Sequence, residues 1–335
     1  MAFTAGAATV GTTPVHRPLI EEYTGTWCGY CVQGLAGMEL LRETFGDDFI
    51  GVAYHNGDAM SFMKSSDYPS RIDGFPTSFI ERVNEVDPLY GSGNFTGDIV
   101  KDMQNCAAIE TPAGIDVTAM WNSADKTAIE LDVTTYFTID DNSGNYAIEV
   151  MLIADDLYGS GSGWNQSNYY SGWTAYKKDP YLGTWVTQAS TVTGIHFNDV
   201  LIGTSGVVSN SLPGSLAAYD DYNFKYTFTL SELPKPALVQ NKDNLHVIAV
   251  VVNTSTGQAI NANRCYISDF SATTIIGDAD DDGVVTITDV TTIIEYLLSG
   301  DESIINLVNA DVDESGNITI NDVTTLIDIL LISGN

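Results

Sequence analysis

Residues 21–31 read EEYTGTWCGYC, with cysteines at positions 28 and 31. This C-x-x-C pair comes directly after a strand pattern that begins at Leu19 and directly before a segment with helical spacing. Backbone N–H groups at the start of a helix stabilise a thiolate, so we expect Cys28 to be the reactive thiol. Cys31, one helical turn further on, is placed to resolve a mixed disulfide on Cys28. The stretch therefore predicts an α/β domain with a redox-active dithiol.

Zinc ligation is the alternative use of a C-x-x-C pair. A structural zinc site takes about four ligands. The sequence holds no second C-x-x-C and no pair of histidines at ligand spacing. The pattern therefore favours a redox pair over a metal site.

The motif WCGYC resembles the active-site motif of the thioredoxin superfamily, and DGFPT at residues 73–77 resembles the cis-proline loop of that family. The resemblance implies that a cis peptide bond precedes Pro76 beside the dithiol. It also implies that the backbone of Phe75 pairs with a substrate strand, and that Trp27 and Tyr30 contact the substrate. The expected activity is thiol–disulfide exchange with protein substrates.

Two further polar residues lie close to this motif in the sequence. Glu22 precedes Cys28 by six residues, where the thioredoxin superfamily has a buried carboxylate that handles the proton of the second cysteine. We expect Glu22 to act as the base for Cys31; the alternative is an exposed glutamate at a strand end. His55 follows the next predicted strand and either lies near the dithiol or fills a structural hydrogen-bonding position.

A different pattern begins near residue 114. Apolar and polar residues alternate with a period of two, which predicts the strands of an antiparallel β-sandwich. Examples lie at residues 129–139, 146–154, 222–230 and 245–252. The sequence DNSG at residues 141–144 predicts a hairpin turn between two of these strands.

A narrower resemblance, to the outer-membrane-protein-28-related family, is carried by AYHNGD at 53–58, GFPT at 74–77, Arg82 and GIHFNDVL at 194–201. That family joins a thioredoxin-like domain to a β-rich domain. The resemblance therefore implies an architecture and a surface location, and it implies little about a reaction.

Two features of the middle region leave alternatives open. Residues 158–185 are rich in Gly, Ser, Asn and aromatic residues, and form either an exposed aromatic platform for sugars or a long hairpin with buried rings. Cys106 and Cys265 are either the two ends of a structural disulfide, in an oxidising compartment, or free thiols in the core.

The last sixty residues contain a repeat with an offset of 33 residues. DADDDGVVTITD at 278–289 recurs as DVDESGNITIND at 311–322. Each copy has oxygen-bearing side chains at loop positions 1, 3, 5, 9 and 12 and glycine at position 6, which is the pattern of an EF-type calcium loop. The predicted ligands are Asp278, Asp280, Asp282, the Val284 carbonyl, Thr286 and Asp289 in the first loop, and Asp311, Asp313, Ser315, the Asn317 carbonyl, Thr319 and Asp322 in the second.

A predicted helix follows each loop, at residues 290–298 and 323–332, and no capped helix precedes the first loop. This duplicated arrangement of loop and helix is similar to a type I dockerin. The resemblance implies two bound Ca²⁺ ions, a cohesin-type partner on a scaffold or cell surface, and an extracellular, outer-surface or periplasmic location. Loop positions 10 and 11 help to select the partner in that family. Here they are Ile287-Thr288 and Ile320-Asn321, which depart from the common Ser-Thr pair.

The charge balance excludes some functions. Lys and Arg total 13 against 44 Asp and Glu, which gives a net charge of −31. Nucleic acids and anionic membrane surfaces would be repelled, whereas divalent cations are the natural counter-charge. No apolar run is long enough to span a bilayer, and residues 1–6 lack a signal-peptide pattern.

The sequence thus predicts three domains: a thioredoxin-like α/β domain at residues 1–112, an antiparallel β-sandwich at 113–272 and a small helical dockerin at 273–335. We predict a secreted or surface-attached thiol–disulfide oxidoreductase that is tethered through its dockerin. The alternative is a non-catalytic cell-surface protein that binds carbohydrate or protein and uses the thioredoxin fold as a scaffold.

Overall fold

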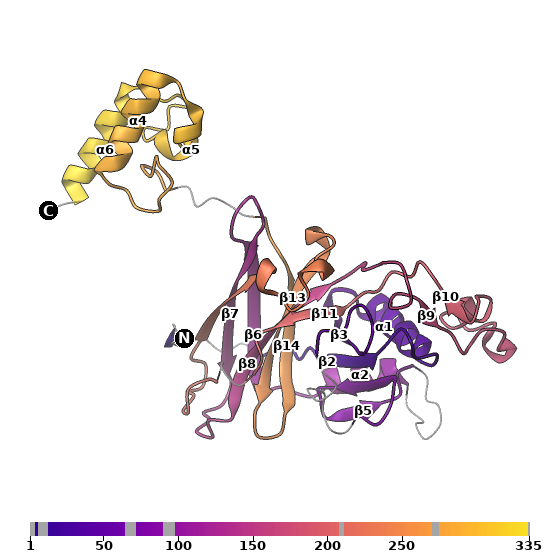
Figure 1. The fold of residues 1–335 in the computed structure, drawn as a ribbon. Coiled ribbons are helices and arrows are strands. Elements are labelled where there is room, and N and C mark those ends of the chain that lie inside the picture. Colours follow the sequence, from indigo (N-terminus) through magenta and orange to yellow (C-terminus); the bar gives the residue numbers. More distant parts are fainter. Residues whose placement is uncertain are drawn as a thin grey trace. The chain divides into compact units, whose positions relative to one another are not determined.

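The computed structural model describes residues 4–5, 13–63, 72–89, 98–207, 211–269 and 275–333. The chain divides into two compact units, residues 1–270 and residues 271–335. Figure 1 shows the first unit in indigo to orange and the second in yellow tones. The predicted junction at residues 272–273 lies outside the described residues.

The first unit begins with an α/β segment. Strand β2 is fully buried and leads through the C-x-x-C loop into helix α1, after which the chain returns in β3, parallel to β2. The elements of this segment are β1 (Thr4–Ala5), β2 (Leu19–Thr24), α1 (Val32–Phe45), β3 (Ile50–His55), β4 (Thr77–Ile80), β5 (Asn84–Val86) and α2 (Ile99–Ala107).

The rest of the first unit is mostly antiparallel strand. Alternating buried and exposed positions in β6 and β7 follow the predicted period of two. The elements are β6 (Ala113–Trp121), β7 (Ala128–Phe137), β8 (Tyr146–Ala154), β9 (Gln166–Ser167), α3 (Gly183–Val186), β10 (Thr191–Val192), β11 (Val200–Thr204), β12 (Tyr222–Thr229), β13 (Leu245–Asn253) and β14 (Gln258–Tyr266). The turn at residues 141–144 lies between β7 and β8, with Gly144 at a φ of 64°. These two strands belong to different sheets, so the predicted hairpin is wrong and the turn instead carries the chain from one sheet to the other.

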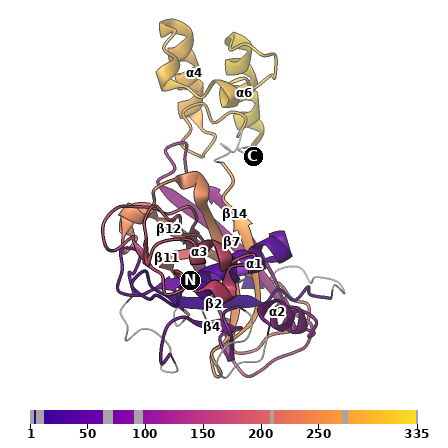
Figure 2. The same cartoon turned by 90° about the vertical axis from the view of Figure 1, so that its right-hand side faces the viewer.

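One eight-stranded sheet crosses the predicted boundary at residue 112. Its strand order is β14-β13-β8-β11-β3-β2-β4-β5, and the join is the parallel pairing of β11 with β3, where Val200 lies opposite Ala53. The segments predicted as two separate domains therefore form one compact unit. Figure 2 shows β2 and β4 in the same body as β11 and β14.

Four apolar clusters lie in this unit, and three of them pack against its sheets. Helices α1 and α2 cover part of one sheet face through residues such as Ile20, Leu41 and Met103. A second cluster lies between the four-stranded sheet β1-β12-β7-β6 and the β8, β11 and β13 strands, with Trp121 and Phe137 among its fully buried side chains. The opposite face of the large sheet carries one continuous cluster that runs from β2 to β14. Because the large sheet is covered on both faces, the end of β2 is a fixed point from which the C-x-x-C loop begins.

The second unit is helical. It contains α4 (Ile287–Ser299), α5 (Leu307–Ala310) and α6 (Ile320–Ser333), each of the two long helices following one of the repeated loops. Its small core includes Ala279, Val290 and Ile293 from the first repeat and Val312, Val323 and Leu326 from the second. Within the described part of the chain, no helix has the length and apolar character needed to cross a membrane.

Candidate functional site

The C-x-x-C loop connects the end of β2 to the start of α1. Cys28 and Cys31 form a disulfide in this loop, and their exposure differs, since Cys28 is 6% exposed and Cys31 is fully buried. Helix α1 begins only at Val32, with Cys31 as its N-cap residue, so Cys28 lies before the helix and not at its first position as predicted. The Cys31 backbone N–H nevertheless donates to Cys28 Sγ over 3.1 Å, which is a contact that favours a thiolate on Cys28.

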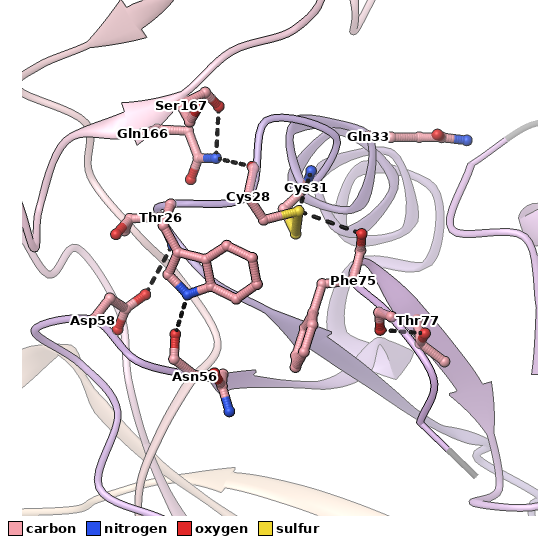
Figure 3. The surroundings of a disulfide bond; sticks show 12 residues. Thr26, Cys28, Cys31, Gln33, Asn56, Asp58, Phe75, Thr77, Gln166 and Ser167 are labelled. Carbon is pink, nitrogen blue, oxygen red and sulfur yellow. Dashed lines mark hydrogen bonds between the residues drawn. A yellow bond between two sulfur atoms is a disulfide. The ribbon is translucent and has the colours of Figure 1, made fainter. Parts of the chain in front are cut away.

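The segment before β4 lies against this disulfide. The peptide bond between Phe75 and Pro76 is cis, as the sequence predicted, and the Phe75 carbonyl oxygen is 3.4 Å from Cys28 Sγ (Figure 3). The Phe75 ring packs edge-on against Trp27, with ring centroids 5.5 Å apart. Trp27 and Tyr30 are each 52% exposed. The surroundings of the more accessible sulfur are therefore aromatic.

Glu22 is buried beneath α1. Its carboxylate packs against Gly34, where a Cβ atom would lie only 1.8 Å from Oε1, and neither oxygen makes a well-formed hydrogen bond with a described residue. Burial raises the pKa of Glu22 to about 8, with the Thr24 side chain opposing this shift and the Asp199 charge adding to it. The alternative of an exposed strand-end glutamate is therefore wrong.

The neighbouring residue has the opposite environment. Glu21 points to the other face of the sheet, where it is paired with Arg82 at 2.9 Å and accepts a hydrogen bond from Tyr54. On its own side, Glu22 borders a cavity of about 160 Å³ that Asp199 also lines. Of these two adjacent buried acids, only Glu22 is held without a cationic partner among the contacts described, which suits a group that takes up and releases a proton.

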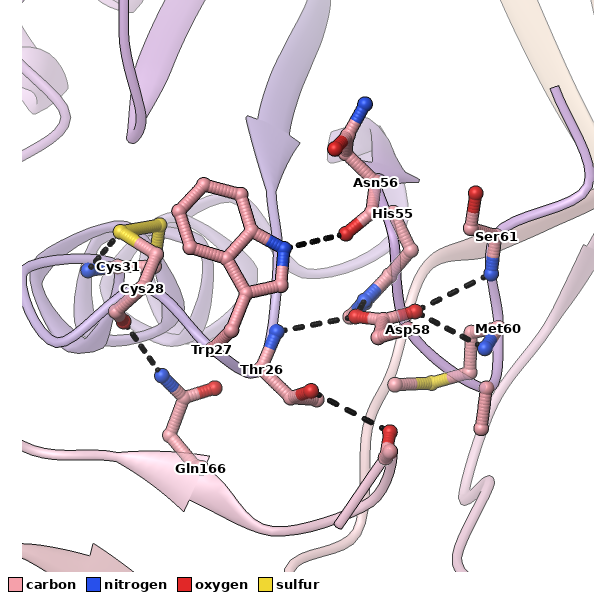
Figure 4. A network of polar contacts seen from close by, with 12 residues as sticks. Thr26, Trp27, Cys28, Cys31, His55, Asn56, Asp58, Met60, Ser61 and Gln166 are labelled. Carbon is pink, nitrogen blue, oxygen red and sulfur yellow. Dashed lines mark hydrogen bonds and ion pairs between the residues drawn. A yellow bond between two sulfur atoms is a disulfide. The ribbon is translucent and has the colours of Figure 1, made fainter. Parts of the chain in front are cut away.

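His55 supports the loop and does not approach the sulfur atoms through any described contact. Its Nδ1 lies 2.7 Å from Asp58 Oδ2, and the same carboxylate oxygen accepts a hydrogen bond from the Thr26 backbone N–H (Figure 4). Although burial opposes ionisation, His55 and the backbone N–H groups of Thr26 and Met60 hold the pKa of Asp58 below its usual value. This network anchors Thr26, the residue before Trp27. His55 therefore fills a structural hydrogen-bonding position, which is the second of the two predicted alternatives.

A long excursion between β8 and β11, residues 158–199, covers the C-x-x-C loop. Three backbone carbonyls of the loop accept hydrogen bonds from it. The Thr26 carbonyl pairs with the Ser167 N–H at 2.7 Å, the Cys28 carbonyl with Gln166 Nε2 at 2.8 Å, and the Gly29 carbonyl with the Tyr169 N–H at 3.0 Å. These contacts join residues about 140 positions apart, and no local pattern in the sequence signals them.

The aromatic residues of this excursion are divided between core and surface. Tyr170 is buried against α1, where its hydroxyl donates to Gln33, and Trp185 packs beside it. Tyr169 is 60% exposed and lies directly over Gly29, whose added Cβ would be 2.3 Å from the Tyr169 ring. Neither predicted alternative describes the region fully, because it also covers the C-x-x-C loop.

The two other cysteines are not bridged. Cys106 and Cys265 are both free, because Cys106 lies in the core beneath α1 and α2 whereas Cys265 packs against the core between the two sheets. Burial raises the pKa of each thiol to about 12. The candidate structural disulfide is therefore not formed in this structure.

The two repeated loops of the second unit have matching hydrogen bonds. Asp278 accepts from the backbone N–H groups of Asp282 and Gly283, and Asp311 accepts from those of Ser315 and Gly316. The position-12 aspartates, Asp289 and Asp322, each accept from the position-3 and position-9 backbone N–H groups at 2.7–3.2 Å. Both loops have left-handed residues at positions 4 and 6. The sequence repeat is thus a structural repeat.

The carboxylates of each loop converge. Oxygen atoms of Asp278, Asp280 and Asp282 lie within 4.8 Å of one another, as do those of Asp311, Asp313 and Asp322. Burial, together with the charges of Asp289 and Asp282, raises the pKa of Asp280. Converging oxygen ligands of this kind suit a hard divalent cation such as Ca²⁺. The hydroxyls of Thr286 and Thr319, the predicted position-9 ligands, donate to the position-12 aspartates.

Comparison with protein families identifies this second unit. Residues 276–331 match the model of the dockerin type I domain. The C-terminal unit is a type I dockerin. A dockerin binds calcium and docks to a cohesin-type partner, and dockerin-bearing proteins are in general extracellular or attached to the cell surface. The family match therefore supports both the predicted cohesin-type partner and the predicted C-terminal calcium module.

Solved structures give weaker likenesses, which cover between about half and three quarters of the chain. The chain is similar to HBP35 of Porphyromonas gingivalis, with 15% identity and a TM-score of 0.50 over 78% of this chain and 79% of that chain. A protein from Agrobacterium tumefaciens, AGR_C_4864, has 11% identity and a TM-score of 0.39, covering 76% and 96%. A domain of the outer membrane lipoprotein Omp28 from Porphyromonas gingivalis has 13% identity and a TM-score of 0.26, covering 48% and 92%.

These likenesses bear on fold and not on activity. HBP35, at 15% identity and a TM-score of 0.50, shares an overall fold with the chain. The other two structures have TM-scores below 0.5, which do not establish a shared fold. No curated protein sequence matches the chain. The thioredoxin-like domain, the β-sandwich and the resemblance to the outer-membrane-protein-28-related family stay predictions.

Proposed function

We propose that this protein is a thiol–disulfide oxidoreductase that its dockerin fixes to a cohesin-bearing scaffold or surface. The observation that carries the proposal is the Cys28–Cys31 disulfide, which links a strand end to a helix start and lies beside the cis Phe75–Pro76 bond. Parallel β2 and β3, the intervening α1, and the β4–β5 hairpin with α2 support a thioredoxin-like assignment for this segment.

The difference in exposure between the two cysteines supports the proposed roles. The reduced Cys28 thiolate, the more accessible of the two, attacks a substrate disulfide and forms a mixed disulfide while one substrate thiolate leaves. Cys31 then attacks Cys28 Sγ, which restores the Cys28–Cys31 disulfide and releases the second substrate thiolate. Two electrons pass from the dithiol to the substrate, and the reverse sequence oxidises a substrate dithiol.

Glu22 is the proposed acceptor of the Cys31 proton. A carboxylate whose pKa is raised to about 8 by burial can take up and return a proton near neutral pH. The cavity beside Glu22 gives this proton room to exchange with water.

The exposed rings around the disulfide are the proposed contacts for a protein substrate. Trp27 and Tyr30 flank Cys28 in the sequence and are both half exposed, and the Phe75 carbonyl borders the Cys28 sulfur. Tyr169, from the aromatic stretch at residues 158–185, packs edge-on against Tyr30 at 5.0 Å and extends this aromatic rim.

In the dockerin, two Ca²⁺ ions are the proposed occupants of the repeated loops, and exposed loop positions are the proposed contacts with the partner. Ile287 and Ile320 occupy position 10 of their respective loops and are 65% and 63% exposed. Large exposed apolar side chains at equivalent places in both repeats suit a partner surface that is itself apolar. A secreted or surface location follows for the whole chain.

Reduction of insulin by dithiothreitol tests the redox proposal. The wild-type chain is expected to accelerate the reaction, and Cys28→Ala to lower the rate to that of dithiothreitol alone. Cys265→Ala, which removes a free thiol on β14, is the matched control and should retain the full rate. A wild-type rate no higher than that of Cys28→Ala would contradict the proposal.

One observation favours a second function. The excursion binds three carbonyls of the C-x-x-C loop, and such coverage also suits a structural disulfide in a non-catalytic binding protein. In that case the disulfide would resist reduction in the native state, so a reduction potential below about −300 mV, typical of structural disulfides, would support the binding role.

A further inference from the structure

A cluster of three side chains of metal-ligating type lies in the first unit and shares no residue with the disulfide site. It brings together His16 from the N-terminal segment, Glu81 from the turn after β4, and Cys106 from α2. One ligand atom from each residue lies within 4.8 Å of the other two. All three are largely buried, with His16 and Glu81 side chains each 6% exposed and Cys106 7% exposed.

The hydrogen bonds of His16 define which ring nitrogen faces the cluster. Nδ1 donates to the Ile109 carbonyl at 2.8 Å, and Nε2 contacts the Glu81 carboxylate. In the neutral ring with its proton on Nδ1, Nε2 presents a lone pair to a carboxylate that is also an acceptor. A positive charge must therefore lie between them, and either a proton or a metal ion can supply it.

The second ligand is held in place in the same way. Glu81 Oε2 accepts a hydrogen bond from Gln258 Nε2 at 3.2 Å, which leaves Oε1 toward the cluster. The Glu81 backbone bonds to Leu19 on one side and Ala259 on the other, and its φ is 53°. A left-handed conformation is costly for glutamate and persists only where the surroundings impose it. Both ligands thus have the outer partners that orient metal-binding side chains.

We propose that His16, Glu81 and Cys106 bind one divalent transition metal of the zinc class. Imidazole, carboxylate and thiolate together favour such an ion over Ca²⁺, which prefers oxygen ligands alone. In a tetrahedral site, ligand atoms lie about 3.3–3.8 Å apart, so a small opening of the His16–Glu81 contact would admit the ion. This proposal is independent of the redox function.

A cavity borders one of the three proposed ligands. Cys106 lines a cavity of about 240 Å³ together with Asp102, Asn105 and Ile109. Water in this cavity would complete the coordination of a site with three protein ligands. The bound ion would tie the N-terminal segment to α2 and to the β4–β5 turn.

Cobalt titration of the full chain tests the site. The Cys28–Cys31 pair is kept oxidised, saturating Ca²⁺ occupies the dockerin, and two free thiols are first verified by titration. We expect one equivalent of Co²⁺ to produce a thiolate-to-cobalt charge-transfer band that Zn²⁺ abolishes. Cys106→Ser should lose the band, whereas Cys265→Ser, the matched removal of the other free thiol, should retain it.

Two further variants keep the test decisive if Cys106→Ser fails to fold. His16→Gln removes a ligand and should weaken Co²⁺ binding at least tenfold, and Gln258→Ala should weaken it about 10–100-fold while the band remains. Absence of the band in the wild type, or its loss in Cys265→Ser, would overturn the proposal. So would an unchanged affinity in His16→Gln.

Discussion

The two chemical sites of this protein are assembled in opposite ways. Each calcium loop takes all its proposed ligands from twelve consecutive residues, and the two loops repeat the same hydrogen bonds. The disulfide site instead combines the C-x-x-C loop, the cis-proline segment at Phe75, Glu22 from β2, and Tyr169 from an excursion about 140 residues later. A site formed by local sequence depends on its ion, whereas a site formed by distant segments depends on the packing of the whole unit.

Removal of calcium should give the largest effect. It tests whether the loops of the dockerin depend on their ions, as the comparison requires. At a free Ca²⁺ concentration one hundred times the Kd, each site adds about 2.7 kcal/mol to the free energy of unfolding, so two sites add about 5 kcal/mol. A chelator is therefore expected to lower the stability of residues 271–335 by this amount and to abolish cohesin binding.

The positions of the tryptophans allow the unfolding of the two units to be followed separately in that measurement. All five tryptophans, at positions 27, 121, 164, 173 and 185, lie in the first unit. Tryptophan fluorescence should therefore melt unchanged in chelator, while far-UV circular dichroism shows an earlier helical transition. Asp278→Asn and Asp311→Asn should each reproduce part of the loss, and an unchanged helical transition would contradict calcium binding.

Substitution of Glu22 tests the buried acid of the disulfide site. Its folded-state pKa, about 8, is raised above the ordinary value of 4.5. The protonated acid therefore contributes its full stability below about pH 4.5, and this contribution is lost as the pH rises through 8. Glu22→Gln should remove this pH dependence and be more stable than the wild type at pH 9 by a few kcal/mol.

Glu21→Gln is the matched control for that experiment. Glu21 is equally buried but paired with Arg82, so its neutralisation leaves a buried cation partly unpaired and should destabilise the protein at neutral pH. Urea unfolding between pH 5 and pH 9 measures both variants. If Glu22→Gln kept the wild-type pH profile, Glu22 would not carry the raised pKa. In Glu22→Gln we also expect a slower second step of insulin reduction, in which Cys31 attacks the mixed disulfide on Cys28.

The contrast between the sites also explains what the sequence could predict. Loop spacing predicted both calcium loops and their helices, because the ligands and the turn glycines Gly283 and Gly316 are adjacent in the chain. The C-x-x-C and the proline of the cis bond were likewise visible as short motifs. The strands predicted at residues 146–154 and 245–252 match β8 and β13 almost to the residue, although both are buried on both faces and do not alternate as predicted.

Long-range pairing is what escaped sequence analysis. The union of two predicted domains depends on β11 lying beside β3, with Val200 opposite Ala53, and both strands are simply apolar in sequence. The cover over the C-x-x-C loop depends on single side chains such as Gln166, and the His16–Glu81–Cys106 cluster joins residues from three segments. None of these has a local signature, because each arises from tertiary packing.

The smallest expected effect concerns the contact between Gly29 and Tyr169. It tests whether packing by a distant segment determines the structure of the disulfide site. An added Cβ at Gly29 would lie 2.3 Å from the Tyr169 ring, so Gly29→Ala should lower the free energy of unfolding by about 1–3 kcal/mol, the usual cost of overpacking.

Removal of the ring should restore most of that loss, because in a Tyr169→Ala background the methyl group has space. The double-mutant coupling energy therefore separates this contact from any intrinsic effect of alanine in the loop. Gly214→Ala is the control, since nothing lies within 4 Å of its added Cβ, and it should be nearly neutral. Equal destabilisation by Gly29→Ala with and without the Tyr169 ring would show that the excursion does not press on the C-x-x-C loop. The middle glycine of WCGYC would then be explained by the loop alone, and the disulfide site would be as local as the calcium loops.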